Sequence, residues 1–417
     1  MHKSTMAKVG AVILGAALVG AACGSDNSSS SSGGAATTKA GATTTAAAGG
    51  AATTATTAAA GGGGAGAIAM PTGAKCSGLA LGFFGAYTGE NSGLGIPIYN
   101  GASLAIDQFN EKNPDCKIEL KKYDSQGSPD QAPQLARSAV GDASVVGIVG
   151  PAFSGESKAA NPIFNEAVLP IVTPSATNAQ LQTNGWTIFH RMLANDAVQG
   201  PGIGKYISDT LKASKVFVID DASEYGKGLA DQVKQTLGSK VIGSDTIDTK
   251  ATDYSSTVTK VKAASPDAVF FGGYYSQAGP LSKQLRDGGV TSAALVFGDG
   301  VLDKKYVELS GSGGEGAVIT CPCAPSPDAF ATAYKAKFNT DPGTYAPEAY
   351  DSAYAFLSAI AAGKVTRADI NTYLKTIDIP GLTKQIKFDA QGETAAKNTY
   401  VYKVGGGKIT PSGSVAG

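Results

Sequence analysis

The chain has 417 residues, of which 42% are hydrophobic, and its 34 basic residues balance 34 acidic ones, so the formal net charge is zero. This length is enough for two domains, and the neutral balance gives no basic footprint for nucleic acid. The two histidines, His2 and His190, leave little room for a histidine metal site or a Ser–His–Asp triad.

Residues 1–22 have the pattern of an export signal. Lys3 and Lys8 supply the positive start, and residues 9–22 form an apolar run that is too short to span a bilayer. The sequence Val-Gly-Ala-Ala-Cys that ends at Cys23 resembles the bacterial lipobox, which implies cleavage before Cys23 and lipidation of its thiol. The alternative is an ordinary secretory signal followed by an incidental cysteine.

Residues 23–74 then comprise the lipidated cysteine and a tether. This segment is nearly all Ser, Gly, Ala and Thr and offers almost no large apolar side chain to bury. Such a composition predicts a flexible, disordered linker between the membrane and a folded body.

Four cysteines remain besides Cys23, an even number that suits an oxidising compartment. Cys76 directly precedes the first apolar strand and Cys116 the second. Neighbouring parallel strands start side by side, so a Cys76–Cys116 disulfide is predicted. Cys321 and Cys323 either close a small ring or stay reduced, and the sequence leaves both open. A zinc site needs a second pair of ligands nearby, and none is visible, so no metal is expected.

Apolar strand patterns alternate with helical patterns from residue 74 onward, which predicts an α/β fold with parallel sheets and helices on both faces. The predicted strands are 79–84, 118–123, 145–149, 169–172, 187–191, 216–219, 241–247, 268–272, 294–297 and 384–388, with a terminal hairpin of 399–404 and 408–410. The predicted helices are 100–110, 128–140, one after Ser154 that Pro162 kinks or delays, 196–211, 221–237, 254–264, 277–287, 327–338, 347–362 and 367–376. Ser128 is expected to cap the second helix with Pro129 at its first position, and residues 316–320 are expected to form a crossing segment.

Two hydroxyl-rich turns follow neighbouring strands. Ser154 comes after the strand at 145–149, and Ser175, Ala176 and Thr177 come after the strand at 169–172. Free backbone N–H groups and hydroxyls at the carboxyl edge of a sheet bind anions such as carboxylates. The alternative is that Ser154 and Thr177 only cap their own helices.

Six short motifs, in this order and spacing, resemble one known family. They are Asn100-Gly101-Ala102, Thr173-Pro174-Ser175-Ala176-Thr177-Asn178, Gln199-Gly200-Pro201, Tyr225-Gly226-Lys227-Gly228-Leu229-Ala230, Gly272-Gly273-Tyr274-Tyr275 and Glu315-Gly316. Over residues 79–404 the chain resembles the type I periplasmic binding proteins, in particular the leucine/isoleucine/valine receptors of ABC importers.

The resemblance implies two doubly wound parallel-sheet lobes that close around a ligand like a hinge. Lobe 1 would comprise residues 75–193 and 324–392, and lobe 2 residues 194–323 and 393–417. The three crossings between the lobes are expected near residue 193, near residues 321–322 and near residues 391–397.

The resemblance also implies where a ligand is bound. Ser154 matches the serine that holds the ligand carboxylate, and the turn of Ser175, Ala176 and Thr177 matches the second arm of that cradle. Asp299 stands near the family's glutamate that pairs with the ligand ammonium, but it is a shorter acid with one extra residue in the preceding loop.

Three further residues bear on the ligand's side chain. Tyr225 and Tyr274 match aromatic residues that the second lobe brings over the ligand; the alternative is that they are surface or core tyrosines. Leu94 occupies a place where the leucine-type receptors have an aromatic ring, so the side-chain pocket is expected to differ in size.

The sequence therefore predicts a monomeric lipoprotein on the extracytoplasmic side of the cell membrane that delivers an amino acid, branched-chain or otherwise hydrophobic, to an ABC permease and ATPase complex. The alternatives are a receptor for urea or a short amide, and a ligand sensor for a membrane signalling partner. An enzyme is not expected. Ser154 lacks a partnering base in sequence, His190 sits in a strand as a structural residue, and no dinucleotide motif or other cofactor site follows the first strand.

Overall fold

The computed structural model describes residues 68–416. The predicted export signal, Cys23 and most of the predicted tether lie outside the described residues. In the part that is described, none of the helices combines the length and the apolar character that crossing a bilayer requires.

The end of the segment predicted as a tether packs on the folded body. Ala74 is buried, and its N–H donates to Oδ1 of Asn113 at 3.0 Å. The side-chain amide of Asn113 donates to the carbonyl of Pro71 at 2.8 Å. Ile68 and Met70 are the first large apolar residues after the Ser/Gly/Ala/Thr-rich stretch, and they pack against the core. The folded body therefore begins before residue 74, because apolar side chains return there.

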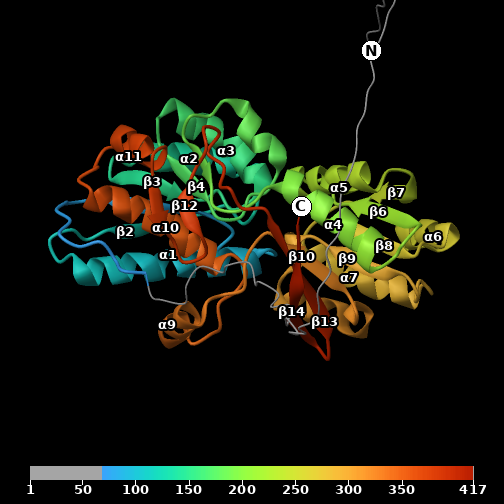
Figure 1. Cartoon of the computed structure of the whole chain (residues 1–417). Helices are drawn as coiled ribbons and strands as arrows, with labels where there is room; N and C mark the ends of the chain where they lie inside the picture. Colours follow the sequence, from blue (N-terminus) through green and yellow to red (C-terminus); the bar gives the residue numbers. More distant parts are fainter. Residues whose placement is uncertain (1–67, 417) are drawn as a thin grey trace, which may run out of the picture. The chain divides into compact units, whose positions relative to one another are not determined.

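The first sheet is entirely parallel, with strand order β2-β1-β3-β4-β5. Its strands are β1 (Ala80–Gly85), β2 (Glu119–Asp124), β3 (Val145–Val149), β4 (Ile171–Thr173) and β5 (Phe189–Arg191). Figure 1 shows helices α1 (Ser92–Lys112), α2 (Ala132–Gly141), α3 (Ser154–Glu166), α10 (Ala346–Ala361) and α11 (Arg367–Leu374) around these strands. Helix α10 is buried along nearly its whole length and packs on α1, β3 and β4.

The second sheet has the order β14-β13-β10-β9-β8-β6-β7, and only its β10–β13–β14 edge is antiparallel. Its strands are β6 (Val216–Asp220), β7 (Val241–Thr246), β8 (Ala268–Gly272), β9 (Ala294–Phe297), β10 (Val318–Cys321), β13 (Asn398–Gly405) and β14 (Lys408–Ala416). Its helices are α4 (Asp196–Lys205), α5 (Glu224–Leu237), α6 (Ser255–Ala264), α7 (Tyr275–Asp287) and α8 (Lys304–Ser310). The two sheets confirm the predicted α/β fold.

The remaining elements are short. Strands β11 (Asp378–Pro380) and β12 (Gln385–Lys387) form an antiparallel pair, and α9 (Asp328–Phe338) precedes α10. The short helices are η1 (Ala179–Asn184), η2 (Tyr206–Thr210, a π-helix that continues α4), η3 (Gly238–Lys240), η4 (Asp299–Val301) and η5 (Gly311–Gly314).

Several predicted boundaries were wrong for local reasons. Helix α1 begins at Ser92 rather than at residue 100, because the two glycines and the proline in its first turns hide the helical pattern. Helix α2 begins at Ala132, because the N–H of Gln131 closes a turn on the carbonyl of Ser128 at 3.2 Å instead of starting the helix. Helix α3 runs unbroken through Pro162. The predicted crossing at 316–320 is largely strand β10, and α8 and β11 were not predicted.

A close helix contact explains one motif glycine. A Cβ atom at Gly101 would lie 2.1 Å from the carbonyl oxygen of Ala346. Helix α1 can therefore approach α10 only without a side chain at this position.

The chain passes between the two sheets at three places: after β5, after β10 and before β13. The first and third lie side by side, since Arg191 forms a parallel bridge with Glu393 and its N–H donates to the carbonyl of Gly392 at 2.8 Å. The second contains a disulfide between Cys321 and Cys323, and Cys76 is joined to Cys116. The lobe boundaries themselves stay a prediction.

Candidate ligand-binding site

A pocket of about 270 Å³, part of it open to solvent, lies among elements of both sheets. Its walls bring together six of the predicted site residues, namely Leu94, Ser154, Ser175, Tyr225, Tyr274 and Asp299. Ala176 and Thr177 are buried but are not among the lining residues. The sequence analysis missed the other lining residues, which are Ile98, Ala152, Phe153, Gly300 and Tyr345.

The start of α3 forms one end of the pocket. Ser154 is the first residue of this helix, and the cap position is held by Phe153, whose N–H donates to Oε2 of Glu156 at 3.1 Å. The hydroxyl of Ser154 accepts the N–H of Asn178 at 3.2 Å, so it ties the two predicted turns together instead of capping α3. The first N–H groups of a helix have no acceptor within the helix, and they favour an anion in front of them.

Glu156 leaves this helix terminus positively polarised. It is fully buried, and burial raises the pKa of its carboxyl group to about 8. At neutral pH the carboxyl therefore keeps its proton and adds no negative charge beneath the first turn of α3. The partial positive charge of the helix terminus remains available to a ligand carboxylate.

The second predicted turn supports this end from behind. The Ser175 hydroxyl donates to the carbonyl of Ala152 at 2.6 Å, and the N–H of Ala176 donates to Oγ1 of Thr173 at 3.0 Å. Since the N–H of Ala176 already has an acceptor, it is not free for a ligand. Helix η1 is capped by the Asn178 side chain, which accepts the N–H of Gln180 at 2.7 Å, so Thr177 is not a cap.

Asp299 forms the opposite, acidic end. Its carboxylate is 1% exposed and accepts two tyrosine hydroxyls: that of Tyr225 on Oδ1 at 2.8 Å and that of Tyr345 on Oδ2. Burial raises the pKa of Asp299, and the two hydroxyls partly oppose this rise by stabilising the carboxylate. Although it is the shorter acid, Asp299 lines the pocket, and it is the first residue of η4.

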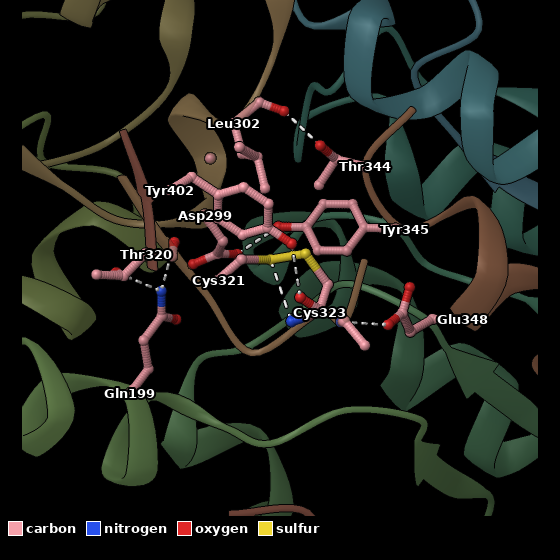
Figure 2. The surroundings of a disulfide bond; sticks show 12 residues. Gln199, Asp299, Leu302, Thr320, Cys321, Cys323, Thr344, Tyr345, Glu348 and Tyr402 are labelled. Atoms are coloured by element: carbon pink, nitrogen blue, oxygen red, sulfur yellow. Dashed lines mark hydrogen bonds between the residues drawn. A yellow bond between two sulfur atoms is a disulfide. The ribbon is translucent and has the colours of Figure 1, made fainter. Parts of the chain in front are cut away.

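Aromatic rings form the wall between the two ends. The Tyr274 ring lies 5.2 Å from the Tyr225 ring and 5.3 Å from the Phe153 ring, measured between centroids. Tyr345 completes the wall beside Asp299 and next to the Cys321–Cys323 disulfide, as Figure 2 shows. This surface suits an apolar ligand segment between the charged ends.

Tyr345 has an uncommon backbone conformation. Its φ is +66°, in the left-handed region that bulky residues rarely adopt, and it directly precedes α10. Such conformations cluster at ligand sites, where the surrounding structure holds them. The sequence carries no local signal for it, because Tyr345 is 46 residues from Asp299 and belongs to none of the recognised motifs.

His190 is structural. It is 1% exposed, and its Nδ1 lies 3.2 Å from the carbonyl oxygens of both Ile171 and Ile188. Burial lowers the pKa of its imidazole to about 4, so the ring is neutral at physiological pH. Within residues 68–416, no group of three or more His, Cys, Asp or Glu side chains is arranged to hold a metal ion.

Known proteins resemble this chain over most of its length. A family model described as periplasmic binding protein matches residues 78–408. An amino acid binding protein of Pseudomonas aeruginosa is 30% identical over 339 residues, which cover 78% of this chain and 90% of that protein. The Leu/Ile/Val-binding protein BraC3 of Rhizobium johnstonii is 30% identical over 346 residues, covering 79% of this chain and 93% of that protein.

Solved structures of other binding proteins also resemble this chain over most of its length. The substrate-binding protein LivJ of a branched-chain amino acid transporter from Streptococcus pneumoniae, in complex with isoleucine, superposes with a TM-score of 0.76 at 29% identity. The match covers 81% of this chain and 99% of that one. The leucine-binding protein LivK of Thermotoga maritima has a TM-score of 0.73 at 25% identity, with 81% and 99% covered.

Proposed function

Because this chain belongs to the type I periplasmic binding proteins of the leucine/isoleucine/valine-binding family, we propose that it is an extracytoplasmic receptor that captures an amino acid with a branched or other hydrophobic side chain. It delivers this ligand to the permease and ATPase of an ABC importer. The relatives found are substrate-binding proteins of transporters rather than enzymes.

The observation that carries the proposal is the polarity of the pocket. The N-terminus of α3 with Ser154 lies at one end, buried Asp299 at the other, and aromatic rings lie between them. A zwitterionic amino acid places its carboxylate at the first end and its ammonium at the second. A ligand that lacks either charge leaves a buried polar group unpaired, which costs more than a lost apolar contact.

Contacts between elements of the two sheets support closure around the ligand. Nζ of Lys158 on α3 lies 2.9 Å from Oε2 of Glu224 on α5. The side-chain amide of Asn178 donates to the carbonyl of the same Glu224 at 2.6 Å. These contacts connect the rims of the pocket, and a hinge motion that opened the pocket would separate them.

The proposal includes attachment to the membrane. Lipidation of Cys23 and the tether that follows would hold a monomeric folded body near its permease, and several acyl chains on one residue anchor a protein stably. Mass spectrometry of the membrane fraction should find the N-terminal peptide beginning at a lipid-modified Cys23. Recovery of all of the protein, with its ligand-binding activity, in the soluble fraction would contradict the membrane anchor.

A ligand panel tests the substrate class. We expect leucine, isoleucine, valine or another hydrophobic amino acid to raise the thermal stability of the purified protein, by about 2.7 kcal/mol at a hundredfold excess over the dissociation constant. Asp299→Asn should lower the affinity for that amino acid about 30-fold or more, because the ligand ammonium then lacks its charged partner.

Asp351→Asn is the matched control, since Asp351 is a buried carboxylate outside the pocket that accepts the N–H groups of Leu382 and Thr383. Its affinity for the ligand should equal that of the wild type. No shift with any amino acid, together with a shift for urea or a short amide, would overturn the assignment in favour of an amide receptor. Unchanged calorimetric affinity in Asp299→Asn would remove Asp299 from the site.

A further inference from the structure

The second crossing contains a disulfide for which the proposed function gives no role. Cys321 ends β10, Pro322 alone separates it from Cys323, and both cysteines are buried. In the chain-entropy account a disulfide stabilises a protein by restricting the unfolded chain, and this effect is smallest when the closed loop is short. A bond between residues only two positions apart therefore acts mainly on the local course of the chain in the crossing.

On one side the crossing is joined to the element that carries Asp299. Strands β9 and β10 are parallel neighbours, and Ile319 lies opposite Phe297. Asp299 and Cys321 each follow two residues later, so both lie at the same edge of the second sheet. The Thr320 hydroxyl extends the pairing by donating to the carbonyl of Phe297 at 3.0 Å. Figure 2 shows Asp299 among the residues that surround the disulfide.

On the other side the crossing is joined to the start of α10. The N–H of Ala324 donates to Oε1 of Glu348 at 3.2 Å. Glu348 is fully buried in the first turn of α10, three residues after Tyr345, which directly precedes the helix. The carbonyl of Cys323 between these two ends accepts the hydroxyl of Tyr402 at 3.2 Å. The crossing is therefore held along its whole length.

Asp299 and Tyr345 meet between elements of the two sheets. The Tyr345 hydroxyl donates to Oδ2 of Asp299, and the neighbouring Thr344 hydroxyl donates to the carbonyl of Leu302. Asp299 follows β9 of the second sheet, whereas Tyr345 precedes α10, which packs on the first. The chain that leads from β10 to α10 runs through the disulfide. The meeting of these two side chains therefore depends on the course of the second crossing.

We propose that the Cys321–Cys323 disulfide is a positioning element of the ammonium site: it fixes the course of the second crossing so that the Tyr345 hydroxyl stays on Asp299, and opening the disulfide weakens binding of the ligand ammonium. The two cysteines are not among the residues that line the pocket, whereas Asp299 and Tyr345 are. The disulfide therefore acts through Tyr345 and not on the ligand itself. This inference rests on the proposed function.

The Tyr345 hydroxyl matters to an ammonium because it orients and stabilises the carboxylate. Burial raises the pKa of Asp299, and the hydroxyls of Tyr345 and Tyr225, in that order, oppose the rise. A hydrogen bond to a charged group is worth about tenfold or more in an equilibrium constant. Opening the disulfide displaces this hydroxyl without removing it, so the loss of affinity cannot exceed that of Tyr345→Phe.

The test is a double-mutant cycle, with affinities for leucine, isoleucine and valine measured by calorimetry. Tyr345→Phe should lower the affinity about tenfold or more. The variant Cys321→Ser/Cys323→Ser should lower it about threefold to tenfold, as a displaced hydrogen bond requires. The same pair of substitutions made in Tyr345→Phe should lower the affinity no further. A disulfide that only stabilised the fold would have the same effect with and without the Tyr345 hydroxyl.

The other disulfide is the matched control. Cys76 precedes β1 and Cys116 precedes β2, so their bond lies at the amino ends of the strands, opposite the edge that carries Ser154. It joins residues with a sequence separation of 40 and should contribute more to stability. Cys76→Ser/Cys116→Ser should nevertheless bind the ligand as the wild type does. Equal losses of affinity in the two disulfide variants would show a general effect of stability and refute the positioning role.

A redox equilibrium tests the same link without a cysteine variant, should Cys321→Ser/Cys323→Ser not fold. In mixtures of reduced and oxidised dithiothreitol, the S–S bond breaks and takes two electrons and two protons from the dithiol, which closes to its own disulfide. Coupling between two equilibria is reciprocal, so a ligand that prefers the oxidised protein opposes its reduction by the same factor. Whichever amino acid binds should lower the ratio of reduced to oxidised Cys321–Cys323 about threefold to tenfold, as mass spectrometry of alkylated peptides measures it. Equal oxidised fractions with and without that amino acid would overturn the proposal.

The outcomes separate the two proposals. If none of the three amino acids binds, the substrate assignment falls and the role of the disulfide falls with it. If one binds but Cys321→Ser/Cys323→Ser has wild-type affinity, the positioning role is wrong and the receptor function stands. The same holds if the two substitutions have their full effect in the Tyr345→Phe background.

Discussion

The ion pair that joins the first and third crossings gives a sharp prediction for stability. Arg191 is fully buried, and its Nε lies 3.0 Å and 3.1 Å from the two carboxylate oxygens of Glu393. Glu393→Gln keeps the shape but leaves the guanidinium charge buried without a counter-ion. Removing one partner of a buried pair costs about 3 kcal/mol or more. At roughly 2 °C per kcal/mol for a large domain, the melting temperature should fall by about 6 °C.

Differential scanning calorimetry measures this fall, and an exposed pair provides the matched control. Lys283 and Asp287 on α7 form an ion pair with both side chains about three-fifths exposed, and Asp287→Asn should cost less than about 1 kcal/mol. Glu393→Gln should also weaken ligand binding, since Arg191 holds the carbonyls of the turn at Ala176 and Asn178. If Glu393→Gln melts no lower than Asp287→Asn, this ion pair is not a structural element of the crossings.

Two further predictions concern the buried carboxyl of Glu156 and the two disulfides. Glu156→Gln should remove a pH dependence of the free energy of unfolding, because below about pH 4.5 the wild-type carboxyl is protonated in both the folded and the unfolded chain. As pH rises toward the folded pKa of about 8, the wild type should lose up to about 1.4 kcal/mol of unfolding free energy per pH unit, measured by urea unfolding. Equal slopes of unfolding free energy against pH in the two proteins would contradict this prediction. Replacing Cys76 and Cys116 by serine should lower the free energy of unfolding by about 4 kcal/mol, because that disulfide joins residues with a sequence separation of 40. Replacing Cys321 and Cys323, which are two residues apart, should lower it by about 1.5 kcal/mol. The reverse order would refute the chain-entropy reasoning.

The strands were predictable because a buried parallel strand is apolar on both faces. The runs at 145–149, 268–272 and 294–297 have the same bounds in the structure as in the sequence analysis. The start of α1 was missed, since Gly93, Gly95 and Pro97 are poor helix formers that tertiary packing holds in the helix. Tertiary packing therefore determines the start of this helix against the local helix propensity of its residues.

The site was predictable only in part. Ser154 and Ser175 were found because they follow strands whose carboxyl ends meet at one edge of a sheet. Tyr345 was not found, because it reaches the acidic end from an element far away in the sequence. Ala176 and Thr177 belong to the right turn, but the structure gives the N–H of Ala176 to Thr173 and leaves Thr177 behind the wall.

In the proposed receptor, selectivity and closure follow from one geometry. The carboxylate site is built on α3 beside the first sheet, and the ammonium site on Asp299 after β9 of the second sheet. A ligand drives closure only to the extent that it binds the closed form better than the open one. A ligand with a single charge pairs that charge at only one of the two sites, so closure adds little to its binding. A zwitterion pairs one charge at each site and therefore gains the second pairing only when the pocket closes.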